Sequence, residues 1–229
     1  MESSCVRARY GAGAAIRNGF AAVFLLALLH SASALSAEPV TIAALGDSLT
    51  QGFGLPEAAG FVPQLQAWLD AQGADVVLIN AGVSGDTTRG GLSRVAWTLT
   101  PEVDAMIVAL GGNDLLRGID PALSRTNIEG ILQVAQGAGV EVMLVGMEAP
   151  GNYGPDYKAQ FDALYPELAA QYGAVFYDSF FAAFDGQADV PAELGAFIQP
   201  DGIHPSAAGV AEIVAHMGPT VLELIEAAQ

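Results

Sequence analysis

Cysteine, histidine and basic residues are all scarce in this sequence of 229 residues. The single cysteine, Cys5, excludes a disulfide-stapled fold and a cluster of thiolate metal ligands. The three histidines offer too few ligands for metal-assisted hydrolysis, so we expect no metal site. Eight Lys and Arg stand against 25 Asp and Glu, a formal net charge of −17. No basic excess exists to neutralise phosphates, and we therefore expect neither a nucleic-acid partner nor an anionic membrane surface.

The first 37 residues differ from the rest and have the order of a secretory signal peptide. Three arginines precede the apolar run 20–29, and the small residues 31–37 follow it, with cleavage expected after Ala34 or Ala37. As a helix, that run spans only about half of the ~30 Å hydrocarbon layer, which argues against a membrane anchor. We therefore predict a cleaved signal peptide over 1–37, one domain over 38–229, and a periplasmic or secreted protein with no stable anchor.

Cleavage would sharpen both the charge and the supply of catalytic groups. Losing three arginines and one glutamate leaves five basic and 24 acidic residues, a net charge of −19. Cys5 leaves as well, so nucleophilic chemistry must use oxygen. Only His204 and His216 remain to support histidine-dependent catalysis.

Five short apolar runs alternate with amphipathic stretches after the signal segment. Continuous runs of this length indicate strands buried on both faces. They cover residues 40–45, 76–80, 105–110, 142–145 and 174–177. Apolar residues at helical spacing lie in 61–69, 128–135, 161–168 and 210–224, whereas 180–200 indicates only a short helix and a loop. The alternation predicts an α/β fold, a five-stranded parallel sheet with helices on both faces.

Ligands bind at the carboxyl ends of the strands in such sheets, and three residues there can support chemistry. Ser48 follows the first run directly, where its hydroxyl and nearby backbone N–H groups can face a cleft. Gly82 and Asn113 end the second and third runs, where a backbone N–H and a side-chain amide can donate to an oxyanion. Taken alone, each residue is also explained by a turn or a helix cap, which is the usual role of a serine after aspartate.

A serine nucleophile needs a base, and the sequence offers two histidines. His204 stands in Asp201-Gly-Ile-His-Pro, just before the last amphipathic stretch. Asp201 lies three residues earlier, a spacing that lets a carboxylate orient the imidazole, although a plain turn explains it too. His216 lies inside the last amphipathic stretch among Ala and Met, and is the weaker candidate.

Four short motifs occur together in one order: Gly46-Asp-Ser-Leu49, Gly82, Gly111-Gly-Asn-Asp114 and Asp201-Gly-Ile-His-Pro205. The chain thereby resembles the SGNH (GDSL-type) hydrolases, whose four conserved blocks stand in this order and rough spacing. The stretches 84–87, 110–118 and 149–154 further resemble the multifunctional periplasmic thioesterases and lysophospholipases of that family. The likeness covers nearly all of residues 40–225.

The resemblance implies a flavodoxin-like three-layer α/β/α sandwich and a metal-free serine mechanism. Ser48 would be the nucleophile, His204 the base and acid, and Asp201 the residue that orients it. The N–H groups of Ser48 and Gly82, with the Asn113 amide, would form the oxyanion hole. The implied substrates are acyl esters and thioesters, among them aryl esters and lysophospholipids, hydrolysed through an acyl-Ser48 intermediate.

Charge and hydrophobic residues narrow these substrates, and two other functions stay open. A net charge of −19 repels polyanionic CoA at long range, which favours neutral or zwitterionic esters. Leu115, Leu116, Phe197 and the Phe-rich stretch 176–184 indicate a groove for an acyl chain. The alternatives are a carbohydrate O-deacetylase of the same family and, in a different class, a non-catalytic flavodoxin-like binding protein. Residues 46–54 lack a phosphate-binding glycine motif, so we expect no nucleotide cofactor. We expect the protein to be a monomer that acts on small esters.

Overall fold

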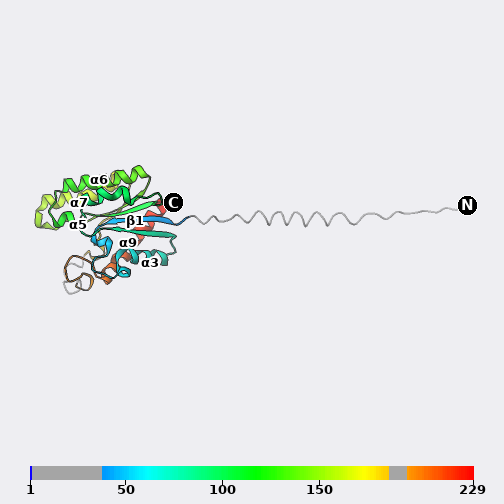
Figure 1. Ribbon diagram of the computed structural model, residues 1–229, viewed down its shortest axis with the longest axis horizontal. Helices are drawn as coiled ribbons and strands as arrows, with labels where there is room; N and C mark the ends of the chain where they lie inside the picture. Colours follow the sequence, from blue (N-terminus) through cyan, green and yellow to red (C-terminus); the bar gives the residue numbers. More distant parts are fainter. Residues whose placement is uncertain (2–37, 186–194) are drawn as a thin grey trace. The chain divides into compact units, whose positions relative to one another are not determined.

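The computed structural model describes residues 1, 38–185 and 195–229. The chain divides into two units, Met1–Glu38 and Pro39–Gln229. The predicted signal peptide lies outside the described residues, and so do residues 186–194 of the segment that the sequence left open. Everything below concerns the second unit, whose elements are shown in Figure 1.

A single parallel sheet forms the centre of this unit. Its strands are β1 (Val40–Gly46), β2 (Val76–Gly82), β3 (Ala105–Ala109), β4 (Glu141–Val145) and β5 (Val175–Tyr177). They pair in the order β2-β1-β3-β4-β5, with every pair parallel. This is the flavodoxin-like order, and the predicted fold class is confirmed. Because β2 and β3 flank β1, residues that follow these three strands meet at the carboxyl end of the sheet.

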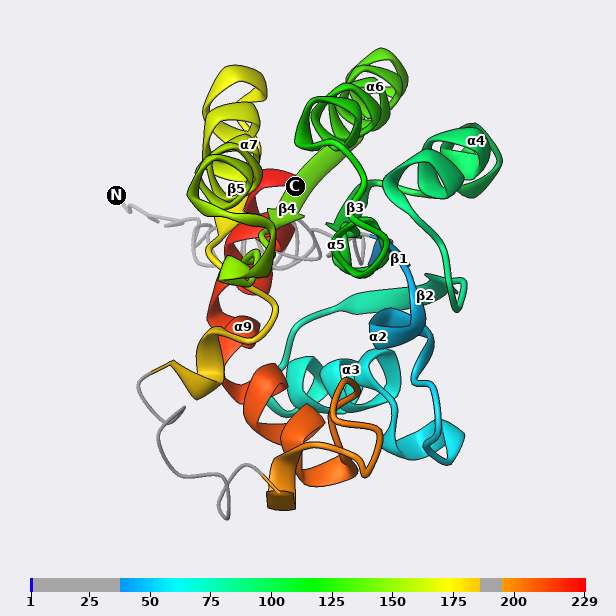
Figure 2. The ribbon, with the colours of Figure 1, turned by 90° about the vertical axis from the view of Figure 1, so that its left-hand side faces the viewer.

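Helices cover both faces of the sheet (Figure 2). One layer holds α3 (Phe61–Ala71) and α9 (Ala207–Ala227), and the other holds α4 (Thr88–Thr98), α6 (Pro121–Ala138) and α7 (Pro155–Tyr172). The connections carry the short helices α2 (Ser48–Gln51) and α5 (Gly112–Leu116) and the 3-10 turns η1 (Glu57–Ala59), η2 (Gly151–Tyr153) and η3 (Ala182–Phe184).

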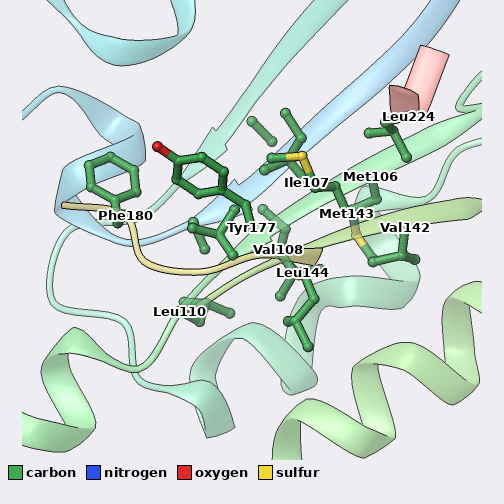
Figure 3. Close-up of a cluster of buried hydrophobic side chains, with 14 of the residues drawn as sticks. Met106, Ile107, Val108, Leu110, Val142, Met143, Leu144, Tyr177, Phe180 and Leu224 are labelled. Atoms are coloured by element: carbon green, nitrogen blue, oxygen red, sulfur yellow. The ribbon is translucent and has the colours of Figure 1, made fainter. Parts of the chain in front are cut away.

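The core lies between the sheet and its two helical layers. All five residues of β3 are buried, and Figure 3 shows Met106, Ile107 and Val108 packed with side chains of β4 and with Leu224 of α9. Fully burying one such side chain stabilises the fold by about 1.5–3 kcal/mol. Leu65, Leu69 and the other leucines and isoleucines that the helical spacing singled out are buried as expected.

Among the described residues, α9 is the one helix long and apolar enough to cross a membrane by length and composition. Half of its apolar window is buried inside the domain. Its buried positions Ile213, Val221 and Leu224 belong to the core, so packing against the sheet accounts for its composition.

Two features differ from the sequence-based expectation. β2 is not buried on both faces, because it is an edge strand, and Val77 and Ile79 are 46% and 37% exposed. The helix α4 carries no clear apolar stripe in the sequence. Its buried residues are Thr88, Gly91 and Val95, and a side chain at Gly91 would overlap Leu110.

Candidate active site

Ser48 is the first residue of α2, and Asp47 alone separates it from the end of β1. Asp47 caps this helix, because its Oδ1 accepts a hydrogen bond from the Leu49 N–H at 3.0 Å. The N-cap role considered for Ser48 therefore belongs to Asp47, which leaves the serine hydroxyl free for other partners. Gly46 is required one position earlier, since a Cβ there would overlap the side chain of Thr50.

Ser48, His204 and Asp201 form a continuous chain of hydrogen bonds. The Ser48 Oγ lies 2.9 Å from His204 Nε2, and His204 Nδ1 lies 2.6 Å from Asp201 Oδ2. The Ile203 and His204 N–H groups both donate to Asp201 Oδ1, at 3.0 and 3.1 Å. The bond from the Ile203 N–H and the contact with the His204 ring lower the pKa of Asp201 to about 2. The carboxylate therefore stays charged beside the imidazole over the ordinary range of pH.

The turn that carries His204 is tied to the segment that follows Ser48. Gln199 donates from Nε2 to the carbonyl oxygens of Phe53, at 2.8 Å, and Pro205, at 3.0 Å. Its own N–H donates to the His204 carbonyl at 2.7 Å. The Phe53 ring also packs on the imidazole, with ring centroids 4.7 Å apart. These contacts join two elements that are more than 140 residues apart in the chain.

Asn113 lies in α5, just after β3, and its side chain reaches the turn between β1 and α2. Its Nδ2 donates to Asp47 Oδ2 at 3.1 Å, which fixes the amide plane and leaves its second hydrogen for another acceptor. Asp47 is buried, and this burial raises its pKa, while the bonds from Leu49 and Asn113 partly oppose the shift.

The neighbouring Asp114 anchors α5 from behind. Its buried carboxylate accepts from the Thr88 N–H at 2.8 Å, the Thr88 hydroxyl at 2.6 Å and the Ser124 hydroxyl at 2.9 Å. The pair Asn113-Asp114 is therefore more than a turn at the end of a strand. Asp114 joins α5 to α4 and α6, and Asn113 presents its amide from that fixed position.

Gly82 does not join this group, which corrects the sequence-based assignment. It pairs with Gly46 inside the sheet, and its N–H donates to Asn80 Oδ1 at 3.0 Å. Its lack of a side chain serves packing, because a Cβ there would overlap the backbone of Gln51. Gly85, three positions later, lines the cavity together with Ser48.

Gly85 has a φ of +83°, a conformation that favours glycine. Within the described part of the chain, its N–H and that of Ser48 have no hydrogen-bond partner. Sequence reasoning chose the glycine at the strand end and passed over the one in the turn. The stretch 84–87, which also carries the family resemblance, contained the signal that could have found it.

A cavity of about 510 Å³ opens beside Ser48, His204 and Asn113. Its volume lies in the usual range for small-molecule sites. Its apolar walls are formed by Leu49, Leu115, Leu116, Met147, Tyr153, Phe181 and Ile203. Leu115 and Leu116, which we expected to form a groove for an acyl chain, both line this cavity.

Most of the phenylalanines expected in that groove lie elsewhere. Phe180 is fully buried in the core, and the rings of Phe184 and Phe197 pack on each other with centroids 5.6 Å apart. Only Phe181 of this stretch is among the lining residues in the described part of the chain. Composition alone could not predict which phenylalanines of this irregular segment point into the core and which point into the cavity.

His216 takes part in a separate contact. Its Nδ1 lies 2.7 Å from the Tyr177 hydroxyl, and burial raises the pKa of Tyr177 to about 12. Neither residue lines the cavity, which agrees with His216 being the weaker candidate for a base. Residues 38–185 and 195–229 contain no group of three or more His, Cys, Asp or Glu side chains placed to hold a metal ion.

Comparison with known proteins gives consistent matches. A model of the GDSL-like lipase/acylhydrolase family matches residues 44–211. Esterase TesA of Pseudomonas aeruginosa is 36% identical over 81% of this chain and 89% of its own length. Thioesterase 1/protease 1/lysophospholipase L1 of Escherichia coli K12 is 32% identical over 80% of this chain and 83% of its own. The crystal structure of AlinE4, an SGNH-hydrolase family esterase, superposes with a TM-score of 0.66 at 40% identity, over 82% of this chain and 97% of that one.

Proposed function

The chain belongs to the GDSL-like lipase/acylhydrolase family of serine ester hydrolases, and we propose that it cleaves small acyl esters through an acyl-enzyme on Ser48. One observation carries this proposal. The hydrogen-bonded chain of Ser48, His204 and Asp201 stands at the wall of a cavity of about 510 Å³ with apolar sides. A nucleophile, its base and a place for an acyl chain are thus adjacent.

Acylation begins when the Ser48 Oγ attacks the ester carbonyl and His204 Nε2 takes its proton. Asp201 holds the ring with Nδ1 protonated, so that Nε2 is free to accept, and its charge stabilises the imidazolium that forms. The tetrahedral intermediate then collapses. Its bond to the leaving alcohol breaks, and His204 returns the proton to the departing oxygen.

Three donors are available for the negative oxygen of that intermediate. They are the N–H groups of Ser48 and Gly85 and the second hydrogen of the Asn113 amide, all from residues that line the cavity. Donors fixed in advance stabilise developing charge, and removing one costs roughly 10²–10³ in kcat in comparable enzymes. A water molecule then attacks the acyl-Ser48, again with His204 as base, and releases the acid.

The walls of the cavity favour an acyl chain over a polar group. Leu115, Leu116, Met147 and Phe181 offer apolar surface next to the nucleophile, and each buried methylene contributes about 0.8 kcal/mol. The predicted charge of −19 after cleavage disfavours polyanionic thioesters of CoA. We therefore propose neutral or zwitterionic acyl esters, such as aryl esters and lysophospholipids, as substrates.

Location follows from the N-terminal segment of the sequence. The order of arginines, apolar run and small residues over 1–37 supports export and cleavage, with residues 38–229 acting as one hydrolase domain in the periplasm or outside the cell. N-terminal sequencing of the protein from the periplasmic and culture fractions tests this. Retention of residues 1–37 in the cytosolic fraction would contradict it.

The mechanism is tested by Ser48→Ala with an aryl acetate as substrate. We expect turnover to disappear while the circular dichroism spectrum is unchanged, whereas Ser93→Ala, at an exposed serine of α4 whose hydroxyl donates to the Gly90 carbonyl, leaves turnover intact. Retained turnover in Ser48→Ala would refute the proposal. Rates on esters of two to twelve carbons, compared with an acetylated sugar, then separate the substrate classes. A strong preference for the sugar would favour a carbohydrate O-deacetylase.

A further inference from the structure

The loop that presents Gly85 connects β2 to α4, and a guanidinium from α4 is inserted behind it. Arg94 donates from Nε to Asp86 Oδ2 at 2.6 Å. It donates from Nη1 to the carbonyl oxygen of Ala81 at 2.7 Å and from Nη2 to that of Gly46 at 2.8 Å. One planar group thus touches the end of β1, the end of β2 and the loop between β2 and α4.

These three acceptors are neighbours of the backbone donors in the site. Gly46 stands two residues before Ser48, and Asp86 directly follows Gly85. The two N–H groups come from different segments of the chain, so noncovalent contacts set the distance between them. Arg94 bonds to both segments at once.

We infer that Arg94, seated on Asp86, is a positioning residue that holds the Gly85 and Ser48 N–H groups at the spacing an oxyanion requires. The inference rests on the proposed function, since it assigns a role within that same site. Neither Arg94 nor Asp86 lines the cavity, so both act through the backbone rather than on the substrate.

The chemistry of arginine suits this task. Its guanidinium is a rigid fork with five donors, and three of them here reach acceptors in three different segments. A lysine ammonium on a flexible stem cannot keep that geometry. The side chains of Arg94 and Asp86 are only 22% and 19% exposed, so water competes little for these bonds.

Other contacts also hold the loop, among them the hydrogen bond from the Val83 N–H to the Gly46 carbonyl oxygen at 3.0 Å. Ser84 bonds to Gln51 at 3.0 Å, and Arg117 donates to the Gly85 carbonyl at 2.9 Å, but both contacts are exposed to water. Displacing a reacting or stabilising group by about 1 Å can cost roughly 10²-fold in rate. Removing the hydrogen bonds of Arg94 should therefore appear in kcat.

Gly90 supplies an independent way to disturb the same ion pair. A Cβ at Gly90 would overlap Asp86 Oδ1, so the glycine makes room for the carboxylate that receives Arg94. In Gly90→Ala the carboxylate must move, whereas alanine itself favours the helix. This variant leaves Arg94 in the chain and touches no residue of the cavity.

The experiment measures kcat and KM on an aryl acetate for Arg94→Lys, Asp86→Asn and Gly90→Ala. We expect kcat to fall about 10- to 100-fold in Arg94→Lys and less in the other two, with KM changed less than threefold. The control is Arg125→Met, which removes another arginine that forms an ion pair, 2.6 Å from Glu167 and away from the cavity, and should keep the parent kcat. The pH dependence of kcat/KM should keep its shape, because Arg94 contacts no member of the Ser48–His204–Asp201 chain.

A purely structural role for Arg94 predicts a lowered melting temperature with kcat within twofold of the parent, and that result overturns the inference. If Arg94→Lys fails to fold, Gly90→Ala decides, and a parent-like kcat there overturns it equally. Ser48→Ala is measured alongside. Turnover retained in Ser48→Ala defeats the proposed function, whereas an inactive Ser48→Ala with fully active Arg94, Asp86 and Gly90 variants defeats only the positioning role.

Discussion

Asn113 donates from Nδ2 to Asp47 Oδ2 across 3.1 Å, and this bond joins the helix after β3 to the turn after β1. The donor belongs to the group that we propose for the oxyanion hole. The acceptor is the residue that precedes the proposed nucleophile and caps its helix. Asp47 therefore couples the orientation of the amide to the position of the serine, a role that the sequence-based assignment of Ser48 and Asn113 did not include.

Asp47→Asn should lower kcat about 10- to 100-fold. An asparagine oxygen can still cap Leu49, but its NH₂ group then faces the NH₂ group of Asn113, and the two donors repel. The matched control is Asp120→Asn, another aspartate N-cap, whose Oδ1 accepts from Ala122 at 2.9 Å in α6. Steady-state kinetics on an aryl acetate compare the two, and equal activity would contradict the coupling.

The same substitution should cost the fold no stability at neutral pH, because removing the buried charge offsets the loss of the bond from Asn113. Burial raises the pKa of Asp47 in the folded state, so the folded protein holds this proton more tightly than the unfolded chain. Stability from this group therefore falls as pH rises through the window above its unfolded pKa, and Asn removes that cost. We expect the melting temperature of Asp47→Asn at pH 8 to equal or exceed that of the parent. A clear decrease would show that the caps and the amide matter more than the buried charge.

Asp201→Asn should reduce kcat by roughly 10⁴-fold, the loss seen when an orienting carboxylate is neutralised in a serine hydrolase. The sign of its effect on stability is opposite to that of Asp47. The folded pKa of Asp201 is lowered to about 2, so its contribution is present above the unfolded pKa of 3.8 and is lost as pH falls toward 2. Melting temperatures at pH 6 and pH 2.5 should differ less in Asp201→Asn than in the parent. An unchanged difference would mean that other carboxylates dominate.

Leu116→Ser should weaken the use of long acyl chains and spare short ones. Leu116 lines the cavity and is 61% exposed, so its replacement removes apolar surface without opening the core. We expect kcat/KM for an octanoyl ester to fall several-fold, because each methylene of the substrate that is left in water costs up to about 0.8 kcal/mol, while the acetyl ester is unaffected. Leu123→Ser is the matched control, since Leu123 is 58% exposed on α6 and lies outside the cavity. A parallel decrease on both esters would argue against an acyl groove.

The fold could be predicted from the sequence because its strongest signals are local and repeated. The run 105–110 is apolar throughout and the run 40–45 is apolar except for Thr41, and these strands are flanked on both sides in the sheet. β2 was misjudged because an edge strand can carry the same residues, and nothing in the run itself tells which strands it will pair with. The helix α4 shows only a weak apolar pattern because its buried side consists of Thr88, Gly91 and Val95, and Gly91 lets it pack closely on Leu110.

The site was predictable where a residue type is tied to its chemistry. Ser48 and His204 stand out because histidine is scarce and the serine follows a strand directly. The choice between Gly82 and Gly85 was not predictable in the same way. Both are glycines near the end of β2, and residue type alone does not separate close packing from a turn that faces the cavity, whereas the φ of +83° at Gly85 does. Arg94 was missed because two of its three partners are backbone carbonyls, which leave no mark in the sequence.

The central claim is that Ser48 is the nucleophile, and covalent labelling tests it most directly. An aryl phosphonate ester reacts with an activated serine, releases one phenol and leaves the phosphonyl group attached to oxygen. We predict one released phenol per chain, loss of esterase activity in proportion to the label, and mass-spectrometric assignment of the label to the peptide that contains Ser48. Activity that survives complete labelling of Ser48, or inactivation with the label on another residue, would contradict the account.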